Sequence, residues 1–291
     1  MNNPISKNWY ADPESRVYGD TVYMYVTNSL PFEQQLNIDL VTTKDLEHFE
    51  TYRSILDMTT FKGADFAIWA PSVVDKDGKY YIVFAANDIH PEDERGGLYI
   101  GVSDDPHGPF KNVFADGRPL LNKFYNKAQP IDAHFFKDDD GTIYLLYGGW
   151  CHLNICIMND AMDGFKQMKE PCADGVAREI TPQNYKEAPY VMKIEGKYHL
   201  MYSTGTWTDG TYAVNAAQTD DLLLGFKCYD TVLKSSEIAV GPGHNSAFFF
   251  KGQHYVAYHR RIVGDKYPHN RLLCIDKLEI KDGKLQPVTM T

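Results

Sequence analysis

The sequence predicts an all-β fold, namely a five-bladed β-propeller that occupies residues 1–291 as a single domain. Three observations support this prediction. One pattern of apolar strand, glycine turn and tyrosine-rich strand returns five times, the copies account for nearly the whole chain of 291 residues, and no linker or low-complexity stretch divides it. Units of this size with four short strands are typical of propeller blades. A β-sandwich would explain many short strands, but not five matched hairpins.

Each copy of the pattern is expected to form a β-hairpin. A glycine beside Asp, Lys or Thr supplies the positive φ that a tight turn requires, and the flanking Tyr, Val and Ile suit a pleated, half-buried surface. The copies span residues 12–26, 69–84, 131–147, 186–202 and 243–258, with turn glycines Gly19, Gly78, Gly141, Gly196 and Gly252.

A second recurring segment follows each of the first four hairpins, at residues 43–49, 103–110, 159–165 and 219–226. It is expected to be the turn between the third and fourth strands of a blade. The last blade is expected to be completed by a strand over 272–280 and a hairpin turn at Asp282-Gly283. Closure of the ring should bring the two chain ends together.

Charge and composition exclude several classes of partner. The chain carries 39 acidic and 29 basic residues, and its net charge of −10 would repel a phosphate backbone, so nucleic acid is not an expected partner. A membrane is not expected either, because no apolar run approaches the length of a bilayer span. Without an apolar leader at the start, a cytoplasmic location is expected. The five cysteines show no CxxC spacing and are expected to be reduced thiols.

The positions just ahead of the hairpins decide the expected function. The first strand of each propeller blade lines the central channel, so these positions should converge on one mouth. They hold Asp12, the Trp69-Ala70-Pro71 stretch, Asp132, Glu187 and His244. Each has a local explanation as a turn former, a backbone partner, an ion pair or a core histidine. Their recurrence favours a function, because three carboxylates that share one pocket repel one another.

Hydrolysis of a glycosidic bond needs carboxyl groups that face each other across a pocket. One of them must be protonated to release the leaving group, and another must be ionised to activate water. The chain resembles glycoside hydrolase family 43, a family of five-bladed propellers that act on arabinose- and xylose-containing saccharides. The motifs that carry the resemblance are, in order, Asp12-Pro13, Trp69-Ala70-Pro71, Ile131-Asp132-Ala133, Glu187-Ala188-Pro189 and Gly241-Pro242-Gly243-His244.

The resemblance implies a role for each carboxylate. Asp12 matches the general base, Glu187 the general acid, and Asp132 the residue that raises the pKa of the acid and orients it. His244 matches a channel histidine that lies beside a central calcium ion or its water shell in many members. The expectation is therefore that the chemistry requires no cofactor, and that His244 is the candidate contact of a hydrated, structural Ca²⁺.

An arginine is also implied by the resemblance, as a contact of sugar hydroxyls or of the neighbouring carboxylate. Arg271, just ahead of the closing strand, matches it, and Arg260 and Arg261 are rivals for the role. The alternative for both rivals is an ordinary surface or edge-strand charge.

Aromatic side chains offer flat faces on which sugar rings stack. Trp69 is the candidate wall of the terminal sugar site, whereas Phe32, Trp150 and Trp207 are candidates for the pocket frame or a leaving-group site, with core filling as the alternative.

The expected function is inverting hydrolysis that releases terminal α-L-arabinofuranosyl or β-D-xylosyl units from arabinoxylan- or arabinan-derived oligosaccharides, with acid and base roughly 6.5–9.5 Å apart. An endo-1,5-α-L-arabinanase and a non-catalytic sugar-binding propeller are the alternatives.

Overall fold

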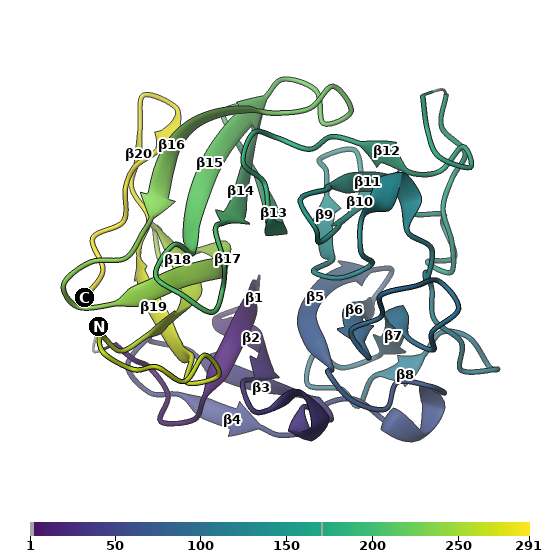
Figure 1. Cartoon of the computed structure of the whole chain (residues 1–291), viewed down its shortest axis with the longest axis horizontal. Coiled ribbons are helices and arrows are strands. Elements are labelled where there is room, and N and C mark those ends of the chain that lie inside the picture. The colour runs from purple at the N-terminus through teal and green to yellow at the C-terminus, as the bar shows by residue number, and fades with distance from the viewer. Residues whose placement is uncertain (1–2, 170) are drawn as a thin grey trace.

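The computed structural model describes residues 3–169 and 171–291. Five antiparallel sheets are arranged radially around a central channel, with β1, β5, β9, β13 and β17 innermost (Figure 1). The prediction of a single ring of five propeller blades is therefore confirmed. All five predicted hairpins are present, and their turn glycines have φ between 62° and 85°. Cys151, Cys156, Cys228 and Cys274 are free thiols, as the sequence predicts.

The blades follow one another along the chain. Blade 1 contains β1 (Tyr10–Tyr18), β2 (Thr21–Asn28), β3 (Ile38–Thr43) and β4 (Glu50–Tyr52). Blade 2 contains β5 (Trp69–Lys76), β6 (Lys79–Ala86), β7 (Gly97–Ser103) and β8 (Lys111–Asn112). Blade 3 contains β9 (His134–Lys137), β10 (Ile143–Tyr147), β11 (Asn154–Ile157) and β12 (Arg178–Glu179). Blade 4 contains β13 (Glu187–Ile194), β14 (Lys197–Thr204), β15 (Ala213–Thr219) and β16 (Lys227–Leu233). Blade 5 contains β17 (Val240–Phe250), β18 (Gln253–Arg261) and β19 (Leu272–Lys277).

The helices of the described residues are three single 3-10 turns, η1 (Phe32–Gln34), η2 (Met58–Thr60) and η3 (Tyr125–Lys127). Within that part of the chain, no helix is long and apolar enough to cross a membrane.

The N-terminal segment closes the ring by running beside β19 of blade 5. The Ile5 N–H donates to the Leu273 carbonyl (3.0 Å), and the Asn3 side chain exchanges two hydrogen bonds of 2.9 Å with the main chain of Ile275. Asn3 and the C-terminal Thr291 consequently lie side by side, with the Asn3 side chain donating to the Thr291 hydroxyl (3.0 Å). This pairing ties the first and last parts of the sequence into one blade.

The prediction that one strand over 272–280 completes the last blade is wrong in its extent. β19 ends at Lys277, and a separate two-stranded sheet follows, formed by β20 (Ile280–Lys281) and β21 (Lys284–Leu285) around the predicted turn. This sheet packs against blade 4, where the Leu285 N–H donates to the Tyr229 hydroxyl (3.1 Å). The outer position of blade 5 is taken by the N-terminal segment instead.

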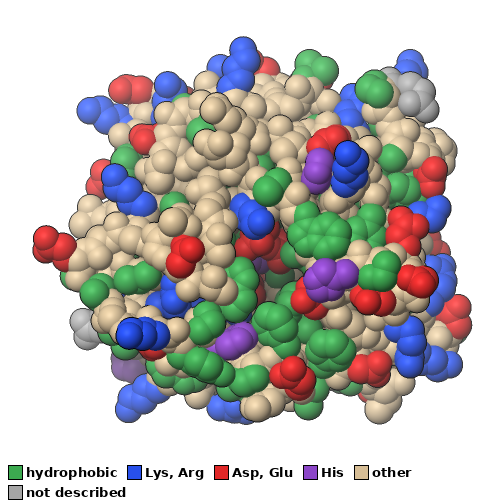
Figure 2. Space-filling view, viewed as in Figure 1, with side chains coloured by type: hydrophobic (Ala, Val, Ile, Leu, Met, Phe, Trp, Pro, Cys, Tyr) green, Lys and Arg blue, Asp and Glu red, His purple; other side chains and the backbone are tan. Residues whose placement is uncertain are grey.

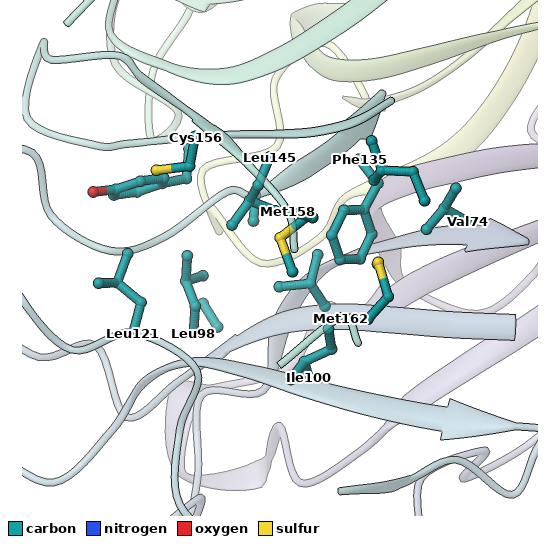
Figure 3. Close-up of a cluster of buried hydrophobic side chains, with 14 of the residues drawn as sticks. Val74, Leu98, Ile100, Leu121, Phe135, Leu145, Cys156, Met158 and Met162 are labelled. Atoms are coloured by element: carbon teal, nitrogen blue, oxygen red, sulfur yellow. The ribbon is translucent and has the colours of Figure 1, made fainter. Parts of the chain in front are cut away.

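Five hydrophobic clusters hold the blades together, and each lies between two neighbouring blades. Figure 3 shows the cluster between blades 2 and 3, where Val74, Leu98 and Ile100 face Phe135 and Leu145. Since the clusters account for the blade interfaces, the acidic residues at the strand starts have no part in the apolar packing.

A left-handed residue precedes or interrupts the inner strand of every blade. The residues are Asp12 (φ 51°), Ala70 (48°), Asp132 (53°), Ala188 (59°) and His244 (41°). In β1, β5, β13 and β17 the pairing register shifts at this point, which marks a β-bulge. A bulge bends the strand and redirects a side chain, at a cost of about 1–3 kcal/mol for a non-glycine residue in this conformation. The left-handed residue is thus repeated five times around one mouth, and the bulge four times.

Candidate active site

A cavity of about 400 Å³ lies at the centre of the face where the inner strands begin. Figure 2 shows this face hollowed at its centre, with acidic side chains in the hollow and hydrophobic side chains around it. The residues lining the cavity include the eight predicted site residues and Trp207, namely Asp12, Phe32, Trp69, Asp132, Trp150, Glu187, Trp207, His244 and Arg271. All five blades contribute to its wall.

The two rival arginines lie elsewhere. Arg260 donates to the main-chain oxygen of Thr291 (2.7 Å), and Arg261 donates to the main-chain oxygen of Asp209 (2.8 Å). Both guanidinium groups therefore hold chain segments in place. Arg271 is the arginine that faces the cavity.

Asp12 is a buried carboxylate surrounded by nitrogen atoms. Its Oδ1 lies 3.1 Å from Nη1 of Arg271, 3.3 Å from Nδ1 of His244 and 3.3 Å from Nδ1 of His259. Burial alone would raise the pKa of Asp12, but the positive charge of Arg271 outweighs burial and holds this pKa well below its usual range. Asp12 is therefore ionised at neutral pH, as a base must be.

The pKa values of Asp132 and Glu187 are shifted upward, in contrast to that of Asp12. Burial raises the pKa of both, and the negative charges of Glu187 and Asp12 raise that of Asp132 further. The main-chain N–H of Ala188 partly opposes this by donating to Asp132. Because the two carboxyl groups titrate as a pair, the pair retains a proton at a pH where isolated carboxyls have lost theirs. One pocket thus holds an ionised carboxylate and a proton-bearing pair.

His259 was missed by the sequence analysis. It accepts a hydrogen bond from the Asp12 N–H at Nδ1 (3.2 Å), and its burial lowers its pKa to about 4. Thr27 and Ser203 accept from the bulge residues of the next blades in the same way (2.9 Å each). A constant spacing in the sequence could have pointed to these three residues. Thr27, Ser203 and His259 each lie on the second strand of a blade, opposite a residue of the inner strand that comes 16 positions earlier in the chain.

Tyr212 was also missed. It lies between β14 and β15, and its hydroxyl donates to Oε1 of Glu187 (2.9 Å). The loop that carries it has no counterpart in the repeat pattern, so the sequence offered no signal for it.

Aromatic rings form one wall of the cavity. The Phe32 ring packs edge-on against Trp69 (4.8 Å between centroids) and lies 6.2 Å from Trp207. Trp69 is fixed by a hydrogen bond from Nε1 to the Gln35 side chain, and the guanidinium of Arg271 lies 5.1 Å from the centre of the Trp207 ring. This arrangement suits a sugar ring, which needs both a flat apolar surface and hydrogen-bonding groups.

Trp150 lies on the opposite side, between blades 2 and 3. It is 40% exposed, has a positive φ of 55°, and packs near His90 and Phe124. Next to it the Gln129 side chain donates to Asp88 Oδ1 (2.9 Å). Ordinary core filling therefore does not account for Trp150, whose ring is available to a ligand.

The described residues contain no group of three or more His, Cys, Asp or Glu side chains placed to hold a metal ion. Calcium prefers six to eight oxygen ligands, and His244 offers one nitrogen beside the Asp12 carboxylate. The side chains at His244 consequently do not form a calcium cage.

The fold and the pocket together define a hydrolase of glycosidic bonds, because a buried ionised carboxylate and a proton-bearing pair face one cavity with an aromatic wall. Comparisons with known proteins agree. The model of the family described as "Glycosyl hydrolases family 43" matches residues 1–285. The chain therefore belongs to glycosyl hydrolase family 43, and it is a glycosidase.

Individual relatives cover nearly the whole chain. The beta-D-galactofuranosidase xynD of Aspergillus niger is 33% identical, over 99% of this chain and 85% of that protein. Xylosidase/arabinosidase 43A of Humicola insolens is 25% identical, over 97% of this chain and 98% of that protein. Among solved structures, a thermostable family-43 glycoside hydrolase aligns with a TM-score of 0.81 at 25% identity, covering 99% of this chain and 96% of that one.

Proposed function

We propose that this glycosidase releases terminal α-L-arabinofuranosyl and β-D-xylosyl units from oligosaccharides by single-step inverting hydrolysis. The observation that carries the proposal is the opposed protonation of the pocket carboxyls, with Asp12 held ionised and the Asp132–Glu187 pair holding a proton. Inverting hydrolysis requires one group in each state at the same pH.

In the proposed reaction, Asp12 accepts a proton from a water molecule as that water attacks the anomeric carbon. Glu187 gives its proton to the oxygen of the departing sugar, so the glycosidic bond breaks as the new carbon–oxygen bond forms. Asp132 titrates together with Glu187, so the pair keeps one proton available for the acid step. Arg271 holds Asp12 ionised and in place, and solvent returns the proton from Asp12 to Glu187 after the products leave.

Removal of terminal units is supported by the wall of the cavity. Residues from all five blades surround it, including Trp69 of blade 2, Trp150 of blade 3 and Trp207 of blade 4. A cavity ringed by side chains in this way suits the end of a chain, whereas an endo-arabinanase needs a groove in which a polymer can lie across the face.

Hydrolysis of nitrophenyl α-L-arabinofuranoside and β-D-xyloside by the wild type and by Glu187→Gln tests the proposal. Cleavage of one or both by the wild type, with loss in the variant, is the expected result. Binding of both sugars without cleavage would establish the sugar-binding alternative. Cleavage of internal bonds in linear arabinan, with neither aryl glycoside cleaved, would establish the endo-arabinanase.

A second candidate substrate is a β-D-galactofuranoside, which the name of the Aspergillus niger relative favours. Its ring has the same configuration as α-L-arabinofuranose, and it differs by one additional hydroxymethyl group on the exocyclic carbon. Asp88 and Gln129 line the same cavity and offer polar groups that can hydrogen-bond that extra hydroxyl. Nitrophenyl β-D-galactofuranoside therefore belongs in the same assay, and a higher kcat/KM for it than for the arabinofuranoside would reassign the substrate.

A further inference from the structure

Tyr212 occupies a space that exists only because residue 243 is glycine. The tyrosine is 1% exposed, and a Cβ added to Gly243 would lie 2.0 Å from Cε1 of its ring. On another side the ring stacks on His259, with 5.8 Å between ring centroids and 10° between their planes. The last glycine of the Gly-Pro-Gly-His stretch is therefore required for close packing of this ring.

The surroundings of the Tyr212 hydroxyl favour donation to Glu187. The Ser203 Oγ accepts from the His244 N–H (2.9 Å), and Ser203 is near enough to the Tyr212 oxygen to oppose the rise that burial causes in the pKa of this phenol. A phenol has a single proton, and Tyr212 donates it to Oε1 of Glu187, 2.9 Å away. Each of these groups is buried or partly buried, which limits competition from water.

Donation to Oε1 determines where Glu187 carries its own proton. An oxygen that accepts the Tyr212 hydrogen bond is the poorer place for a proton, so the acidic proton resides on Oε2. A general acid works only if its proton faces the leaving oxygen at hydrogen-bond distance. A carboxyl group free to rotate would spend part of its time with the proton facing the protein.

We propose that Tyr212 is a positioning residue for the general acid, which directs the proton of Glu187 onto Oε2 and towards the leaving group, with Gly243 providing the room for its ring. The inference rests on the proposed function, in which Glu187 is the acid. It adds a residue that none of the recurring motifs contains.

Several charged groups face Glu187 besides this phenol. Asp12 raises the pKa of Glu187, whereas Arg271, Lys186 and the Tyr212 hydroxyl lower it, and the carboxyl of Asp132 titrates together with it. Removal of the hydroxyl alone leaves the other groups in place. The alkaline limb of the pH profile should then move to higher pH, since one stabilising contact of the ionised acid is lost.

Tyr212→Phe is the deciding variant, because it keeps the ring and removes only the hydroxyl. General-acid assistance contributes about 10²- to 10⁴-fold, and loss of its orientation should remove part of that. On a disaccharide, whose leaving group needs protonation, kcat should fall about 10- to 100-fold. On the 2,4-dinitrophenyl glycoside of the same sugar, whose leaving group needs no proton, the fall should stay below about 3-fold. Tyr202→Phe is the matched control, since that buried hydroxyl donates to the Gln183 carbonyl (2.7 Å) outside the cavity lining.

The outcomes separate the two proposals. Equal losses on both leaving groups, or an alkaline limb that does not move, would overturn the role of Tyr212 while leaving the hydrolase intact. A wild type that cleaves none of the glycosides would overturn the proposed function itself. Gly243→Ala offers a second variant, and it should reproduce the leaving-group dependence of Tyr212→Phe by displacing the ring.

Discussion

Replacement of Arg271 by Met removes the cation that holds the catalytic base ionised, while keeping an unbranched apolar side chain in place of the arginine stem. In the wild type, Nη1 of Arg271 lies 3.1 Å from Oδ1 of Asp12, and Nε donates to the Ser29 hydroxyl (2.8 Å). Arg271 and Asp12 are 7% and 6% exposed, so the Asp12 charge is only weakly hydrated once the cation is removed.

The expected loss of stability is large. Two opposite charges about 3 Å apart attract by about 5 kcal/mol at an effective dielectric constant of about 20. Removal of one partner of a buried pair costs about 3–5 kcal/mol of unfolding free energy, because the other charge stays buried. At about 2–4 °C per kcal/mol, the melting temperature of Arg271→Met should fall by roughly 10 °C.

The pH dependence follows from the pKa of Asp12. In the wild type this pKa is held below its usual range, so activity should persist far into the acidic region. Without Arg271, burial prevails and raises the pKa of Asp12, and the acidic limb of kcat/KM should move to higher pH. The difference in stability between the two proteins should be largest at neutral pH. It should shrink as the pH falls through the raised pKa of Asp12 in the variant, because the folded variant then takes up a proton while Asp12 of the folded wild type stays ionised.

Arg261→Met is the matched control, since that guanidinium is also buried but donates to the Asp209 carbonyl. Chemical denaturation and pH-rate profiles of both variants provide the comparison. The reasoning would be refuted if Arg271→Met left the acidic limb in place, or if Arg261→Met moved it equally.

Four further outcomes are expected. Asp132→Asn should stabilise the protein by about 0.5–2 kcal/mol at pH 7 and abolish most activity. The folded pocket raises the pKa of this carboxyl, so the stability of the wild type falls as the pH rises above about 4. Urea titrations should show the gain in stability at pH 7 and its disappearance at pH 3. Glu187→Gln should lower kcat on a disaccharide by about 10²- to 10⁴-fold but affect a dinitrophenyl glycoside much less; equal losses would argue against an acid role. Trp150→Ala should raise KM for oligosaccharides with kcat nearly unchanged, and an unaltered KM would remove Trp150 from the leaving-group site. Chelation with EDTA should leave aryl-glycoside turnover within about twofold of the untreated enzyme; a larger loss that added calcium restores would show that an ion takes part.

The repeats explain why so much of the cavity lining could be predicted. Equivalent positions in a closed ring converge on its axis, so a residue that recurs ahead of each hairpin, as Asp12 and Asp132 do, can be placed without knowing any loop. The turn glycines fixed the hairpins in the same way, because each occupies a left-handed turn.

The features that were missed depend on distances that no repeat encodes. Tyr212 reaches Glu187 from an irregular loop, and its place depends on the absent side chain of Gly243. The five left-handed residues could not be predicted either, because Ala70 and Ala188 have no intrinsic preference for that conformation. The surrounding sheet imposes it. The closing strand was misassigned because the N-terminal segment has no strand pattern of its own and is held there by Asn3 and Ile5.

The stereochemistry of the first product tests the central claim most directly. Proton NMR of a disaccharide or aryl glycoside during the first minutes of hydrolysis distinguishes the two anomers before they interconvert. The account predicts that the sugar first appears with inverted configuration, because water activated by Asp12 attacks the face opposite the bond that Glu187 protonates. First appearance of the retained anomer would contradict the assignment of Asp12 as a base.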